Sequence, residues 1–148
     1  MKKKGLDYFY IPTTNDVNID LLTAKFGIEA YAIYIKLTQK IYNENGYYLQ
    51  ISKDKLALLK MEFCLAPEDD ISENNISENN IMEKIIDFCT EQDIWNRELF
   101  EKYHILTSNE IQKAYLIATR KRKNIDIKKE YRLTYAKDYF AKKLSNKA

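Results

Sequence analysis

The sequence predicts a mainly α-helical fold with a small β element. Only three glycines and two prolines occur in 148 residues, and such a composition favours helices over a turn-rich all-β fold. Hydrophobic residues make up 45% of the chain, which is enough for a packed core and too many for wholesale disorder. The length suits one domain with an appendage.

Capping residues and apolar spacing predict two helices at the start. Asp16 or Asn18 is placed to cap a helix through residues 20–26, and Gly27 follows where a left-handed residue often ends a helix. A second helix is expected over residues 28–42. Its apolar residues recur at three-to-four spacing over a broad surface, so it should be contacted on more than one side. These residues are Ile28, Tyr31, Tyr34, Ile35, Leu37, Ile41 and Tyr42.

A short strand and a third helix should follow. Residues 45–46 are Asn-Gly, which predicts a turn, and apolar residues alternate over 47–51 as in a strand. Ser52 is a suitable N-cap for a helix over residues 53–63. Residues 71–80 are two copies of Ile-Ser-Glu-Asn-Asn, which we interpret as a duplication that lengthened a solvated loop.

The second half predicts a fourth helix and then two strands. The helix should begin near Ser77 or Asn79, turn apolar residues such as Ile85 and Phe88 inward, and end at Asp93. Two β-rich segments follow, separated by a small insert. They are residues 94–96 and 105–107.

Two more helices complete the expected order. Thr107 and Glu110 have capping-box spacing and should start a helix that continues to Arg122. A last helix is expected over residues 126–144, and it would align three tyrosines at i, i+4 spacing: Tyr131, Tyr135 and Tyr139. Helices, a strand, two helices and a two-stranded wing are the order of a winged helix-turn-helix. We therefore expect a winged-helix domain over 1–123 and a basic C-terminal helix or tail over 124–148.

The charges divide the chain into two unlike parts. Residues 1–112 hold 12 Lys/Arg against 19 Asp/Glu, a net charge of −7, whereas residues 113–148 hold 12 against 3, a net charge of +9. Such asymmetry indicates a polyanionic partner for the basic part. The candidate phosphate contacts are Arg120, Lys121, Arg122, Lys123, Lys128, Lys129 and Arg132, with Lys137, Lys142 and Lys143 beyond them.

Tyr131 and Tyr135 lie among these cations and could stack on unpaired bases. Two structural alternatives remain open. Cations at the end of a helix stabilise its negative pole without any ligand, and a tyrosine row is often a packing face, against the domain itself or a second copy.

The fourth helix is a poor candidate for the DNA contact. In a winged helix this element would enter the major groove, but its acidic residues would approach phosphate with like charge. Against one lysine, Lys84, the segment carries Glu78, Glu83, Asp87 and Glu91.

No catalytic or metal-binding pattern is present in the sequence. The three glycines are scattered, so there is no Gly-rich phosphate loop, and His104 is the sole histidine. We expect a protein that is not an enzyme and has no cofactor. Residues 1–4 lead into no apolar signal segment, and no apolar stretch could span a membrane. A cytoplasmic protein is therefore expected, with Cys64 and Cys89 reduced and buried as small core residues.

Three segments together resemble the N-terminal winged-helix domain of phage replisome organisers and DnaD-like primosome proteins, a phage-type domain of unknown function. They are Lys4-Gly5-Leu6-Asp7-Tyr8-Phe9, AKFGIEAYAIYIKLTQKIYNENGYYL at 24–49 and ELFEKYHILTSNEIQKAYLIATRKRK at 98–123. Two features depart from the pattern. Residues 65–80 are longer and more acidic than the usual turn, and His104 stands where a glycine is more usual.

The resemblance implies a DNA-binding and assembly module in the initiation of phage or mobile-element replication. The partners it implies are double- or single-stranded DNA, replication proteins such as a helicase or its loader, and further copies of the chain in a homo-oligomer, with no membrane. Two alternatives remain: a protein–protein oligomerisation scaffold without direct DNA binding, in which the acidic body of one copy meets the basic tail of another, and a winged-helix transcriptional repressor.

Overall fold

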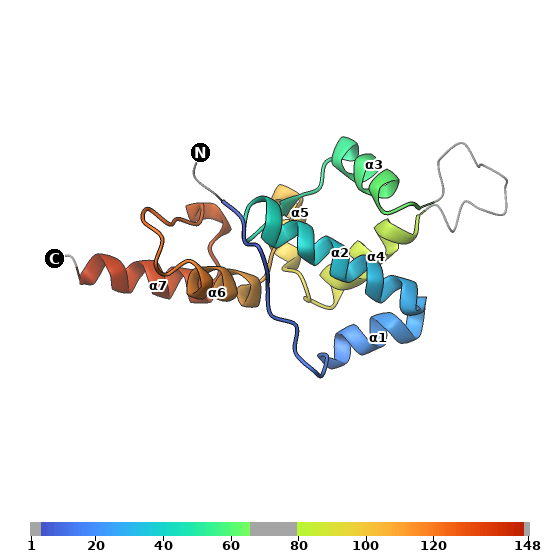
Figure 1. Cartoon of the computed structure of the whole chain (residues 1–148), viewed down its shortest axis with the longest axis horizontal. Helices are drawn as coiled ribbons and strands as arrows, with labels where there is room; N and C mark the ends of the chain where they lie inside the picture. The colour runs from blue at the N-terminus through green and yellow to red at the C-terminus, as the bar shows by residue number, and fades with distance from the viewer. Residues whose placement is uncertain (1–3, 66–79, 147–148) are drawn as a thin grey trace.

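The computed structural model describes residues 4–65 and 80–146, which form seven α-helices, one short 3₁₀ helix and a two-stranded sheet (Figure 1). In chain order these elements are α1 (Val17–Phe26), α2 (Ile28–Glu44), β1 (Leu49–Gln50), α3 (Lys53–Glu62), α4 (Ile81–Glu91), α5 (Arg97–Tyr103), β2 (Ile105–Leu106), α6 (Asn109–Ala118), η1 (Lys129–Tyr131) and α7 (Thr134–Ser145). The mainly helical fold expected from composition is confirmed. The solvated loop expected over the Ile-Ser-Glu-Asn-Asn duplication lies almost wholly outside the described residues.

Helix α2 is the centre of the fold and contacts α1, α4 and β1. Leu37 and Ile41 on α2 are fully buried, so the prediction of a central helix is confirmed. Its inward face is rotated from the predicted one: Ile28 is 72% exposed, while Ile33, which was not predicted, is buried. The two positions are five residues apart, which places them about 140° apart around a helix of 3.6 residues per turn.

Two predicted N-cap residues are confirmed, because their side chains accept a hydrogen bond from the first turn of the helix. Asp16 accepts a hydrogen bond from the Asn18 N–H at 2.8 Å, and Ser52 accepts one from the Lys55 N–H at 3.0 Å. Gly27 separates α1 from α2 at φ 91°, a conformation that is strained for any residue with a Cβ.

The sheet pairs β1 with β2 in antiparallel register, Leu49 opposite Leu106 and Gln50 opposite Ile105. The strand predicted over 105–107 is present as β2, but residues 94–96 form no strand, so the predicted pairing of these two segments into a wing is wrong. The N–H groups of Ile94 and Trp95 both donate to the carbonyl of Cys89, which keeps this segment in the turn that ends α4.

A helix takes the place of the predicted insert between the two wing strands. The Asn96 side chain accepts from the Leu99 N–H at 2.9 Å and so caps α5. Asparagine is among the strongest N-caps, and here capping prevails over the strand preference of the preceding Ile-Trp. α5 ends at His104, which has the left-handed conformation with φ 55° and ψ 42°. The resemblance predicted a glycine at this position, and His104 adopts the left-handed conformation that glycine favours.

The predicted boundaries after β2 are also corrected. Ser108, not Thr107, caps α6, because the Thr107 hydroxyl is buried and donates to the carbonyl of Tyr47. α6 ends at Ala118, four residues before Arg122. The single helix expected over 126–144 is instead η1 followed by α7, so Tyr131 does not share a helical row with Tyr135 and Tyr139.

The two cysteines have different environments. Cys89 is buried, as predicted, and burial raises the pKa of its thiol to about 12. Cys64 is exposed just after α3, so its prediction as a core residue is wrong. None of the helices within the described residues has the length and apolar character needed to cross a membrane.

Candidate nucleic-acid interface

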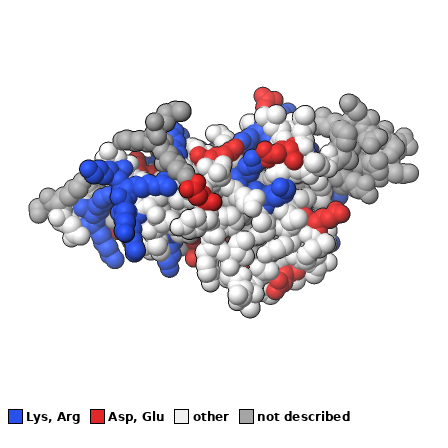
Figure 2. Space-filling view, viewed as in Figure 1, with Lys and Arg blue, Asp and Glu red and all other residues white. Residues whose placement is uncertain are grey.

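The positive charge gathers at one end of the molecule. Between residues 113 and 146 there are 11 Lys/Arg against 3 Asp/Glu. Figure 2 shows the densest group of blue side chains at the left, which Figure 1 assigns to α6, α7 and the segment between them. We call this part of the molecule, residues 113–146, the basic end. Elsewhere on this face blue and red side chains are interspersed.

The segment that links α6 to η1 carries the exposed cations Arg120, Lys121 and Lys123. Its two ends are fixed. Thr119 is fully buried at the end of α6, and Ile127 is fully buried before η1. The Lys128 N–H also donates to the Tyr47 hydroxyl at 3.1 Å. These cations therefore lie on a short loop with anchored ends, rather than in the last turn of a helix.

Arg122 joins the N-terminal segment to this loop. Its guanidinium donates to the carbonyl of Gly5 at 3.1 Å, and the Leu6 N–H donates to the carbonyl of Tyr42 at 2.8 Å. Exposed Lys4 is thereby placed beside the loop. The run of lysines at the start of the chain was visible in the sequence. Its contact with the loop was not, because Lys4 and Arg122 are far apart along the chain.

Arg132 makes its polar contacts within the basic end. Its guanidinium donates to the Ile127 carbonyl at 2.8 Å and to the Asp126 carboxylate at 2.7 Å. It also lies over the Phe140 ring, 4.0 Å from the centroid. Its positive charge is partly compensated by Asp126, whereas Lys128 and Lys129 are exposed beside it.

The two candidate tyrosines lie in different environments. Tyr131 is 7% exposed and packs edge-on against Tyr48 and Tyr103, each with ring centroids at 5.2 Å. That position favours the packing alternative for Tyr131. Tyr135 is half-buried, its N–H donates to the Asn109 side chain at 2.8 Å, and the ammonium of Lys113 lies 5.7 Å from its ring centroid.

The aromatic cluster brings a further lysine toward the basic end. Lys128 lies over the Tyr131 ring at 5.3 Å, and Lys102 of α5 lies over the adjacent Tyr103 ring at 5.4 Å. Lys102 is exposed. Sequence reasoning placed it in the insert of a wing, and no pattern indicated that α5 would pack near η1.

Helix α4 presents negative charge outward. Met82, Ile85 and Phe88 are buried on its inner side, and Glu83 pairs with Lys60 of α3. Asp87 and Glu91 are exposed. Burial, followed by the charges of Glu91 and Glu83, raises the pKa of Asp87 above its ordinary value of 3.8. The outer surface of α4 therefore carries two carboxylates, Asp87 and Glu91, against one lysine, Lys84.

The described residues include no candidate metal site. Within residues 4–65 and 80–146, no three His, Cys, Asp or Glu side chains are placed to hold one metal ion.

Comparison with known proteins identifies a family for most of the chain. The family described as Lin1244/Lin1753-like, N-terminal matches residues 8–111. The chain is also 29% identical over 133 residues to an uncharacterized phage-related protein, Lin1244/Lin1753, of Listeria innocua serovar 6a; the match covers 88% of the chain and 39% of that relative. The chain thus spans about two-fifths of the relative's length. No solved structure matches. These matches confirm the predicted phage-type domain, and the family match ends just before the basic end.

Proposed function

The chain belongs to the Lin1244/Lin1753-like N-terminal family, and we propose that it is a DNA-binding and assembly module that acts in the initiation of phage or mobile-element replication. The observation that carries the proposal is the set of exposed cations on an anchored loop, Arg120, Lys121 and Lys123, at one end of an otherwise acidic molecule. A phage-related relative is consistent with such a role.

The proposed mode of binding is phosphate contact without base readout. Each cation that neutralises a phosphate releases condensed counterions, which gives affinity that does not depend on sequence and falls steeply with salt. The loop cations, Lys128, Lys129 and Lys4 supply this attraction, while α4 stays away from the DNA because its outer side is acidic. Binding of this kind suits a protein that coats or bends DNA in the cytoplasm before a helicase or its loader arrives.

We further propose that the fold is a variant of the winged helix. α3, α4 and the β1–β2 pair have the order of that fold, and α5 stands where the wing hairpin would be. In such a variant the wing cannot insert into a minor groove, which leaves the basic end as the DNA-facing part.

The test is the salt dependence of DNA binding by a loop variant. Arg120→Ala, Lys121→Ala and Lys123→Ala together should reduce the slope of log K against log salt by about 2–3, since each lost contact is worth about 0.9 on duplex and about 0.7 on single strands. Fluorescence anisotropy with random-sequence single- and double-stranded DNA gives this slope for the full chain.

A matched control removes three exposed cations from the acidic body: Lys25→Ala, Lys36→Ala and Lys53→Ala. It has the same net charge as the loop variant and should keep the wild-type slope. Equal slopes for the loop variant and the wild type would exclude the loop. A chain that binds no DNA even at low salt would favour the scaffold alternative, and strong preference for one sequence would favour a repressor.

A further inference from the structure

A groove of about 530 Å³ lies between the N-terminal segment, α2 and the start of α6. We propose that this groove receives the last turn of α7 from a second copy of the chain, so that copies assemble head to tail. This inference goes beyond DNA binding, because it concerns a different face of the molecule and different residues of the basic end.

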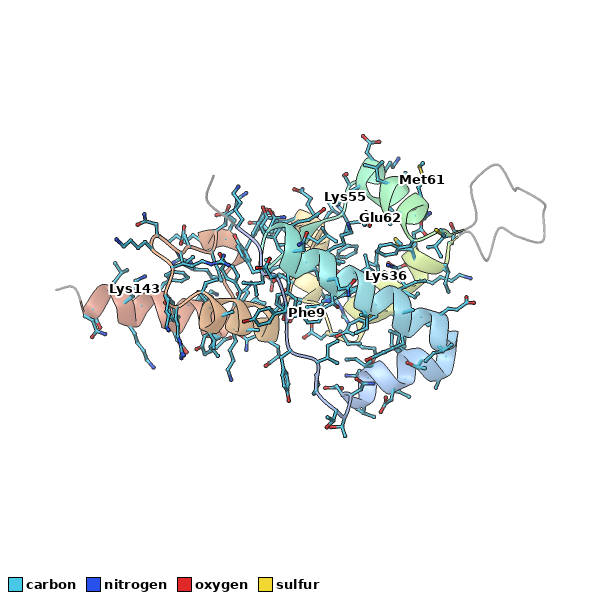
Figure 3. The ribbon with its side chains drawn as sticks, in the orientation of Figure 1. Phe9, Lys36, Lys55, Met61, Glu62 and Lys143 are labelled. Carbon is cyan, nitrogen blue, oxygen red and sulfur yellow. The ribbon has the colours of Figure 1, made fainter. Side chains whose placement is uncertain are left out.

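The walls of the groove are aromatic. Six rings line it: Phe9, Tyr10, Tyr31, Tyr34, Tyr42 and Trp95. Four of them form stacked pairs, Phe9 on Tyr42 at 4.9 Å and Tyr34 on Trp95 at 5.7 Å. Figure 3 shows Phe9 reaching from the N-terminal segment toward α2. Rings that are already stacked are held in place, so the groove needs little reorganisation to accept a side chain.

The rim of the groove is negative. Asp16, Asp93 and Glu110 line it, and none of the described residues that line it is a lysine or arginine. Asp16 caps α1, and Asp93 accepts from the Arg97 N–H at 3.3 Å. None of the three carboxylates forms an ion pair with another described residue, so their charge is left for a ligand.

Besides burial, the charges of Glu110 and Asp16 contribute to the raised pKa of two tyrosines in the groove. Burial raises the pKa of Tyr42 to about 12, and the charge of Glu110 adds to the effect. Burial also raises the pKa of Tyr34, with Asp16 among the smaller contributions. Aromatic faces and nearby carboxylates together suit the aliphatic stem and charged head of lysine. A basic, partly apolar segment is therefore the matching occupant.

The last turn of α7 has that chemistry. Lys142 and Lys143 are exposed there, and Leu144 beside them is 71% exposed. Lys143 lies at the far end of α7 in Figure 3. Two cations next to an uncovered leucine complement a groove with a negative rim and an apolar wall.

The α7 of the same molecule cannot fill the groove. Leu133 and Thr134, where α7 begins, already line it, and the Tyr135 N–H holds this end to Asn109 of α6. A helix rises 1.5 Å per residue, so Lys143 lies about 14 Å from Thr134 along the axis. Figure 1 shows α7 running away from the body. The donor must be a second copy.

Docking of one surface into a different surface has a consequence for the size of the assembly. A contact made in one direction leaves a free groove at one end and a free α7 at the other, so it continues into rings or open chains, whereas two copies that exchange their α7 helices close as a dimer. The contact between opposite charges should also weaken with salt, because the screening length falls from about 10 Å at 0.1 M to about 3 Å at 1 M.

Sedimentation velocity of the full chain without DNA tests the proposal by charge reversal. The groove variant carries Asp93→Lys and Glu110→Lys, and the tail variant carries Lys142→Glu and Lys143→Glu; all four positions are exposed. Wild type should form dimers or larger species at low salt and dissociate at high salt. Each variant alone should stay monomeric, and an equimolar mixture should assemble again, because every groove then meets a tail of opposite charge.

The control reverses two lysines of the body, Lys25→Glu and Lys53→Glu, and should assemble like wild type. Circular dichroism of each variant establishes that it is folded. A wild-type chain that stays monomeric, a single folded variant that assembles like wild type, or a folded mixture that stays monomeric would each overturn the proposal. Because no DNA is present and the loop cations are unchanged, failure here leaves the proposed DNA binding intact.

Discussion

Gln112 shows at the scale of one residue how the basic end is held to the body. The side chain is fully buried in α6, and its amide donates to the Tyr131 carbonyl at 2.7 Å while accepting from the Leu133 N–H at 2.9 Å. Nothing in the sequence pattern indicated this, since glutamine is ordinarily a surface residue and its partners lie about twenty positions away. The capping roles of Asp16 and Ser52, by contrast, were predictable because their partners are local.

His104 leads to a prediction about stability. A residue other than glycine in the left-handed region is strained by its Cβ, and His104 is exposed with φ 55°. We expect His104→Gly to raise the free energy of unfolding by up to about 1 kcal/mol, the relief of strain being offset in part by the greater freedom of glycine in the unfolded chain. Urea denaturation measures the change.

The control for this prediction is His104→Ala, which loses the edge-on contact of the imidazole with Phe100 but keeps the strained backbone. Alanine should therefore be less stable than glycine at this position. The opposite order would show that the imidazole ring, rather than the backbone conformation, determines stability there.

Among the elements, helices with a local cap and a long apolar stripe were predictable, and the segment that replaces the wing was not. Ile94-Trp95-Asn96 has strand-like composition, yet Trp95 is buried against Tyr34 and Asn96 caps a helix. The burial of Trp95 and the capping by Asn96 both depend on where α2 and β2 lie, which the local sequence does not specify. The last helix was predicted too long for a similar reason, because η1 exists where Gln112 holds the Tyr131 carbonyl.

The acidic outer side of α4 gives a prediction at the scale of the element. Asp87→Asn with Glu91→Gln should leave DNA affinity unchanged or raise it, since the change removes repulsion without removing a contact. Anisotropy at fixed salt measures the affinity, with Asp54→Asn and Glu98→Gln on α3 and α5 as a control of equal charge. A clear loss of affinity confined to the α4 variant would place α4 at the DNA after all.

The same variant should change the pH dependence of stability. The folded protein binds the Asp87 proton more tightly than the unfolded chain, because burial and neighbouring carboxylates raise this pKa above 3.8. Asp87 therefore makes stability fall as the pH rises through the range just above 3.8, and Asp87→Asn should reduce that fall. Asp87 is largely exposed, so the effect is expected to be well under 1 kcal/mol.

At the scale of the whole molecule, the division of charge along the sequence becomes a division in space. The sequence already contained the two unlike parts, and Figure 2 shows the cations gathered at one end. What the sequence could not supply was their accessibility: Arg120, Lys121 and Lys123 are exposed, Arg132 is engaged with Asp126, and Tyr131 is buried. Folding therefore leaves some of these residues accessible to a ligand and engages or buries others, a difference that composition cannot indicate.

Chemical-shift mapping by NMR tests the central claim most directly, by titrating the isotope-labelled full chain with a short random duplex and with a single strand. We predict that backbone amides of residues 119–129 and of Lys4 shift with added DNA, that these shifts diminish as salt rises, and that amides of residues 81–91 stay in place. Shifts concentrated in 81–91, with residues 119–129 unchanged, would contradict the account.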